Sequence, residues 1–83
     1  MVRVKLYGMA RDLVGKEELD VEVERQITLE DLIERITKSR GKASPTQAEV
    51  ILINGRNCVF MEGLKTQIHD GDLIEILPLV RGG

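Results

Sequence analysis

One helical stripe between strand-like segments constrains the fold of this chain more than any other feature. Apolar residues recur at i, i+3, i+4 and i+7, which is typical of one face of an α-helix, at Leu29, Leu32, Ile33 and Ile36. Thr28 precedes this stripe as a candidate N-cap, and Gly41 is a candidate stop. Because a single stripe can cover one face of one sheet, the pattern predicts an α+β roll.

The segments on both sides of the helix carry strand patterns. Apolar and polar residues alternate in 2–7 and 19–24, which is typical of half-buried strands. The run 50–53 is apolar throughout, so we expect a strand that is covered on both faces. Further strands are predicted at 57–61 and 73–77. Together these segments predict a mixed sheet of four or five strands.

Glycines mark the breaks between these elements. The segment 9–14 is long enough for a short helix, and Gly15 interrupts it. Asn54 and Gly55 form the strongest short hairpin signal in the sequence. Asp70 and Asp72 flank another glycine and are interpreted as turn residues.

Composition excludes several classes of function. The 83 residues allow one domain, 1–83, and only Tyr7 and Phe60 are aromatic, so the core must be aliphatic. The net charge is −2 and basic residues are spread along the chain, which argues against nucleic-acid binding. The apolar runs are too short to cross a bilayer, and the N-terminal segment lacks a secretory pattern. We therefore expect a cytoplasmic protein.

The strongest functional signal is the terminal pair Gly82 and Gly83. The tail is expected to be flexible and to span 78–83, because Pro78 should end the pairing of the last strand. Leu79 to Gly83 could project by at most about 17 Å, at roughly 3.3–3.6 Å per residue. Glycines can enter a channel that any Cβ would block. The alternative is that the pair is simply a frayed end.

A tail of this kind would present the α-carboxylate of Gly83 to a partner. A carboxylate is unreactive toward nucleophiles at neutral pH, and the cheapest biological activation is an acyl-adenylate made from ATP. The chain has no glycine-rich phosphate loop. We therefore expect the ATP chemistry to belong to another protein, with no cofactor bound to this one.

The remaining candidates are weaker as sites of chemistry. Nothing in the sequence brings Cys58 and His69 together, and Cys58 falls in a predicted strand, where a buried apolar role is the commoner one. One cysteine and one histidine do not make a metal cluster. Leu73 and Leu77 are expected on the sheet face away from the helix, as an apolar docking patch near the tail.

Taken in order, the residues of the C-terminal half resemble the MoaD/ThiS family of β-grasp sulfur carriers, which are relatives of ubiquitin. The likeness is greatest to the archaeal-type MoaD proteins, the small subunits of molybdopterin synthase. The segment from Tyr7 to Gly15 resembles the first crossover of the family. The C-terminal residues that carry the resemblance are Ile53-Asn54-Gly55-Arg56-Asn57, Phe60, Gly63-Leu64, Thr66, Asp70-Gly71-Asp72, Ile74, Ile76, Pro78, Val80 and Gly82-Gly83.

This resemblance implies a β-grasp fold and a cycle of sulfur transfer. An adenylyltransferase of the MoeB/ThiF type would adenylate Gly83, and a sulfurtransferase would convert it to a thiocarboxylate. The large subunit of molybdopterin synthase (MoaE type) would receive the tail, and the sulfur would pass to the molybdopterin precursor. In this cycle Gly82 gives clearance, and Leu79, Val80 and Arg81 line the channel entrance. The chain would not be catalytic alone.

Three alternatives remain open at the level of sequence, and the first is a plain binding module whose terminal glycines are a frayed end. Arg81 before the two glycines resembles the end of ubiquitin, so the chain is also a candidate protein modifier that is joined to lysines through Gly83. The thiamine pathway uses related sulfur carriers and is the other branch.

Overall fold

The computed structural model describes residues 1–37 and 49–78. The helices and strands follow this order: β1 (Val2–Leu6), α1 (Gly8–Val14), β2 (Glu18–Val21), β3 (Ile27–Thr28), α2 (Leu29–Thr37), β4 (Glu49–Ile53), β5 (Arg56–Asn57), η1 (Cys58–Phe60), η2 (Gly63–Lys65), β6 (Gln67–Ile68) and β7 (Leu73–Pro78). The η elements are 3-10 helices.

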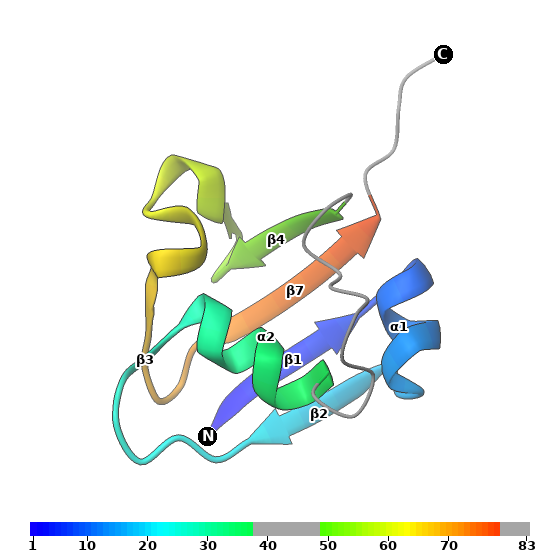
Figure 1. Ribbon diagram of the computed structural model, residues 1–83, viewed down its shortest axis with the longest axis horizontal. Coiled ribbons are helices and arrows are strands. Elements are labelled where there is room, and N and C mark those ends of the chain that lie inside the picture. The colour runs from blue at the N-terminus through cyan, green and yellow to red at the C-terminus, as the bar shows by residue number, and fades with distance from the viewer. Residues whose placement is uncertain (38–48, 79–83) are drawn as a thin grey trace.

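The main sheet has five strands in the order β2-β1-β7-β4-β5. β1 and β7 are parallel neighbours, and the other pairs in this sheet are antiparallel. Figure 1 shows α2 lying across one face of the sheet, with β1 and β7 at its centre. The expected mixed sheet and single main helix are therefore confirmed. A separate two-stranded sheet of β3 and β6 was not predicted.

The core lies between α2 and the sheet, and it is aliphatic as expected. Alternate residues of β1, β4 and β7 are buried, and α2 contributes its stripe. Each fully buried Leu, Ile or Val side chain contributes about 1.5–3 kcal/mol relative to exposure. The buried apolar residues of the described chain are Val2, Val4, Leu6, Ala10, Val21, Leu29, Leu32, Ile33, Ile51, Ile53, Cys58, Ile68, Ile74 and Ile76.

The opposite face of the sheet is more open, and this corrects one expectation. The run 50–53 was expected to be covered on both faces, but only Ile51 and Ile53 are buried, while Val50 and Leu52 are half-buried. The described helices contribute their buried residues to the other side of the sheet. Neighbouring strands cover Val50 and Leu52 in part, which accounts for an apolar run without a second covering layer.

Local signals set the helix starts and stops as the sequence indicates. The hydroxyl Oγ1 of Thr28 accepts a hydrogen bond from the Asp31 amide at 3.1 Å, which is the expected N-cap. Gly15 ends α1 in the left-handed region, with φ of 88°, and its N–H donates to the Arg11 carbonyl at 2.7 Å. The predicted stop at Gly41 lies outside the described residues.

Three predicted boundaries are wrong, the first being the strand expected at 19–24, which ends at Val21. The strand expected at 57–61 ends at Asn57, because the Asn57 side chain accepts a hydrogen bond from the Val59 amide at 3.0 Å and starts η1 instead. Pro78, expected to begin the tail, belongs to β7 and pairs with Glu49. Proline lacks only the N–H donor, so it fits as the last residue of a strand.

Two turns at one end of the sheet are tied together by side chains. Asn54 and Gly55 both have positive φ, 53° and 86°, as the predicted hairpin turn requires. The Asn54 amide Nδ2 donates to Asp72 Oδ1 at 2.9 Å, and its Oδ1 accepts from the Leu73 amide at 2.9 Å. Asp72 Oδ2 also accepts from the His69 amide at 2.7 Å. These bonds fix where β7 begins.

This linkage can be tested with Asn54→Gly. Glycine keeps the positive φ but removes both side-chain hydrogen bonds, so the free energy of unfolding should fall by about 1–2 kcal/mol. Urea denaturation measures this change. Asp72→Ala, which removes both acceptor oxygens, serves as the partner variant in a double-mutant cycle, in which a coupling energy near zero would contradict the linkage.

Candidate functional site

The expected site is the tail, and the structure shows how its root is held. The sequence-predicted residues Leu79, Val80, Arg81, Gly82 and Gly83 all lie outside the described residues. The residue before them, Pro78, ends β7, which is the central strand of the five. β7 is paired with β1 on one side and with β4 on the other. The tail therefore continues from a strand that is anchored on both sides.

Leu73 and Leu77 lie on the open face of the sheet, each half-buried, while Ile74 and Ile76 between them point into the core. Leu77 pairs with Val50 of β4, next to the tail root. Leu73 lies at the far end of β7 and pairs with Arg3. The two leucines are thus on one face, as their positions require, but they do not lie side by side.

Polar groups separate the two leucines. Glu75 lies between them on the open face, and the Tyr7 hydroxyl donates to its Oε2 at 3.4 Å. Beyond Leu73, the guanidinium of Arg3 pairs with Glu18 at 3.2 Å and with Asp20 at 3.3 Å. The open face is therefore apolar near the tail root and charged at its other end. A partner that follows the tail would meet Leu77 and Val50 first.

A second apolar surface was missed by the sequence analysis. Four residues of η1, η2 and their link are exposed, and we call them the η surface: Val59 (68%), Phe60 (79%), Met61 (38%) and Leu64 (36%). The signal was the continuous apolar run from Cys58 to Met61, which does not alternate as a half-buried strand should. The predicted strand at this position obscured it.

Cys58 and His69 do not form a catalytic pair. The thiol of Cys58 is buried in the core from η1, whereas the His69 side chain is exposed in the turn before β7. Burial raises the pKa of the Cys58 thiol, and a backbone hydrogen bond offsets part of that rise. Cys58 is thus a buried apolar residue, as expected. Within residues 1–37 and 49–78 no group of three or more His, Cys, Asp or Glu side chains could hold a metal ion.

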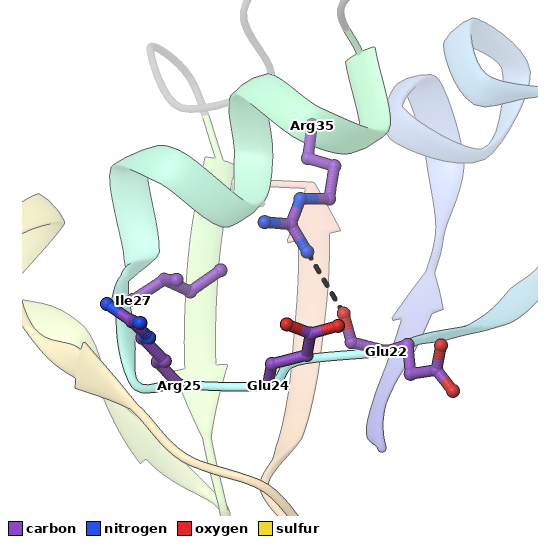
Figure 2. A pocket seen from close by; sticks show the side chains of 5 residues that line it. All are labelled: Glu22, Glu24, Arg25, Ile27 and Arg35. Carbon is purple, nitrogen blue, oxygen red and sulfur yellow. Dashed lines mark hydrogen bonds between the residues drawn. The ribbon is translucent and has the colours of Figure 1, made fainter.

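A hollow lies beside α2, between the helix and the charged connection that follows β2. It has a volume of about 320 Å³, and its lining mixes two acidic and two basic side chains with one isoleucine: Glu22, Glu24, Arg25, Ile27 and Arg35. Figure 2 shows Arg35 reaching from the helix to the backbone of the loop, where its Nη1 donates to the Glu22 carbonyl at 3.0 Å. This bond ties the connection after β2 to the helix.

Comparison with known proteins identifies relatives along nearly the whole chain. The model of the ThiS family matches residues 4–83. A protein of Archaeoglobus fulgidus whose name suggests a sulfur carrier is 47% identical over 58 residues, which cover 70% of this chain and 62% of that protein. The chain thus spans less than two thirds of that relative.

No helix in the described part of the chain has the length and apolar content to cross a membrane.

Solved structures agree with the fold. The small archaeal modifier protein 1 of Methanosarcina acetivorans has a TM-score of 0.75 at 32% identity, covering 99% of this chain and 95% of that one. A Pyrococcus furiosus protein named as a candidate molybdopterin converting factor, subunit 1, has a TM-score of 0.76 at 27% identity, covering 95% and 97%. The sheet order and the single main helix are thus those of the ubiquitin-like β-grasp fold. With this fold and the match over residues 4–83, the chain belongs to the ThiS family of sulfur carriers and ubiquitin-like small modifiers.

Proposed function

We propose that this protein is a sulfur carrier for molybdopterin synthesis, with Gly83 as its reactive group. The observation that carries the proposal is the match of the sulfur-carrier family through Gly83, together with a central strand that ends five residues before it. The similarity to a protein named as a candidate molybdopterin converting factor supports this pathway over the thiamine pathway.

In the proposed cycle, the chemistry on Gly83 takes place in partner enzymes. An adenylyltransferase of the MoeB/ThiF type joins the carboxylate to AMP and releases pyrophosphate from ATP. A persulfide on the sulfurtransferase attacks the acyl-adenylate and AMP leaves, and a thiol reductant then cleaves the resulting acyl disulfide to give the thiocarboxylate. In the large subunit of molybdopterin synthase, this group gives its sulfur to the pterin precursor. Gly82 leaves room in a narrow channel, because it has no Cβ.

The described part of the chain serves this cycle as a docking platform. In our proposal the partners contact the apolar end of the open face, where Leu77 and Val50 lie next to the tail root. Leu73, at the charged end beside Arg3, contributes at the rim of the contact. Leu79, Val80 and Arg81 then occupy the channel entrance. Because docking would hold the root of the tail in place, only the few tail residues would have to be ordered for Gly83 to reach the reacting geometry.

Adding one alanine after Gly83 should abolish sulfur transfer while leaving the fold unchanged. The added residue places the carboxylate one residue too far along the chain, at a distance of about 3.3–3.6 Å. The measurement is thiocarboxylate formation, read as intact mass with fragmentation of the C-terminal peptide. The O-to-S exchange adds about 16 Da, close to a methionine oxidation, so the shift must be located on the C-terminal residue, which is Gly83 in the wild type and the added alanine in the variant. Sulfur transfer by the extended chain would refute the proposal.

Leu77→Lys should weaken docking without changing the chemistry. A lysine stem can lie along the sheet, but its charge must be desolvated in the contact. We expect the KM of the adenylyltransferase for this chain to rise at least about fivefold, the effect of roughly 1 kcal/mol at an interface. Val59→Lys on the η surface is the matched control and should leave KM unchanged. Equal KM values for both variants would argue against docking through the open face.

A second function is favoured by one specific observation. The chain is 32% identical, over nearly its full length, to a protein named as a small archaeal modifier, and Arg81 precedes its two glycines as in ubiquitin. The same activated Gly83 would then be attacked by a lysine amine, giving an isopeptide bond. Lysine adducts with a Gly-Gly remnant in the host proteome would support this function. Their absence under several growth conditions would contradict this second function and leave sulfur transfer as the one proposed function.

A further inference from the structure

Pro78, the last residue of β7, has a different neighbour on each side. β1 ends at Leu6, which pairs with Ile76, and the Tyr7 amide then donates to the Ile76 carbonyl at 3.0 Å. Beyond this point the chain of β1 turns into α1 at Gly8. Pro78 therefore has Gly8 on one side and Glu49 of β4 on the other.

Gly8 combines two properties, of which the other described glycines share only the first. Its φ of 60° lies in the left-handed region, and a Cβ built on it would approach Pro78 Cγ to 3.2 Å and Pro78 Cβ and Cδ to 3.4 Å. The other four glycines that the structure describes also have positive φ, but a Cβ on any of them would meet nothing within 4 Å. Gly8 is therefore needed for its small size as well as for its backbone conformation.

We propose that Gly8 is a positioning residue for the tail, which it directs through Pro78. The proline ring contains the backbone N and Cα of Pro78 and fixes its φ. A contact with three ring atoms therefore also acts on the backbone from which the next peptide unit begins. A side chain on Gly8 would displace the ring by a few tenths of an ångström. The end of β7, from which the tail continues, would shift with it. The effect of this shift on transfer rests on the proposed function.

Gly8→Ala and Gly63→Ala form a matched pair that separates contact from strain. Gly63 has a φ of 58°, almost the same as that of Gly8, but open space around it. Both alanines should therefore lower the thermal midpoint, since they carry the same left-handed strain. Only Gly8→Ala should move Pro78, and this contact should add to its loss of stability. A cooperative unfolding transition in both variants serves as the internal control for folding.

The activity test is ATP-dependent adenylation by the adenylyltransferase, with KM and kcat measured separately. A misplacement of 1 Å costs about 10²-fold in rate, so a few tenths of an ångström should lower kcat about fourfold. KM should stay unchanged because the open face is intact. Pro78→Ala in the Gly8→Ala background removes Cγ and Cδ and should restore most of kcat. Equal kcat values for Gly8→Ala and Gly63→Ala would overturn the proposal.

A second measurement tests the positioning without any enzyme. Residual dipolar couplings of the amides of Leu77 and Leu79 should differ from wild type in Gly8→Ala and match it in Gly63→Ala. Unchanged couplings in Gly8→Ala would overturn the proposal even if sulfur transfer is established. Conversely, a wild-type chain that is never adenylated would overturn the proposed function, and the couplings alone would then decide the role of Gly8.

Asparagine replaces alanine in both positions if Gly8→Ala does not fold. Asparagine tolerates the left-handed region better than alanine does, while its Cβ meets Pro78 in the same way. Gly8→Asn should then change the couplings and lower kcat, and Gly63→Asn should do neither. A Gly8→Asn variant with wild-type couplings and kcat would count against the positioning role as firmly as the alanine result.

Discussion

The parallel pairing of β1 with β7 is the constraint on which the rest of this structure depends. It joins the first strand to the last one described, and it aligns Val4 with Ile74 and Leu6 with Ile76 so that all four side chains enter the core. Parallel neighbours need a long crossover between them, and the chain places its helix and its remaining strands there. The same pairing sends the end of β7 toward the start of α1, where the tail root meets Gly8.

Features with a local signal could be predicted from the sequence. The cap at Thr28, the turn at Asn54 and the stop at Gly15 are each determined by residues within one or two turns of the chain. The predictions fail where a side chain competes with strand pairing for a backbone amide, or where the paired segments are far apart in the sequence. At Asn57 the side chain accepts a hydrogen bond from the Val59 amide, which the predicted strand would have used for pairing. The pairing of Ile27 with Ile68 joins segments about forty residues apart, and strands of two residues are too short to show an alternating pattern.

In the candidate site too, some features could be predicted from local sequence, and others depend on residues far apart in the chain. The two terminal glycines are visible in the sequence, and alternation alone assigns Leu73 and Leu77 to the face opposite Ile74. The division of that face into an apolar and a charged end follows from strand register, which brings Val50 to Leu77 and Arg3 to Leu73. The contact between Gly8 and Pro78 joins residues seventy positions apart. Such a contact cannot be predicted before the strand order is known.

The strand directions also determine how the molecule responds to force. β1 begins and β7 ends at opposite ends of the same parallel ladder, and Figure 1 shows the two strands running in the same direction. A pull on the tail against the N-terminus would load the evenly spaced hydrogen bonds of this ladder in shear, all together and not one after another. A pull on the end of β7 along the strand, with the N-terminus held, would thus be resisted by the whole ladder at once.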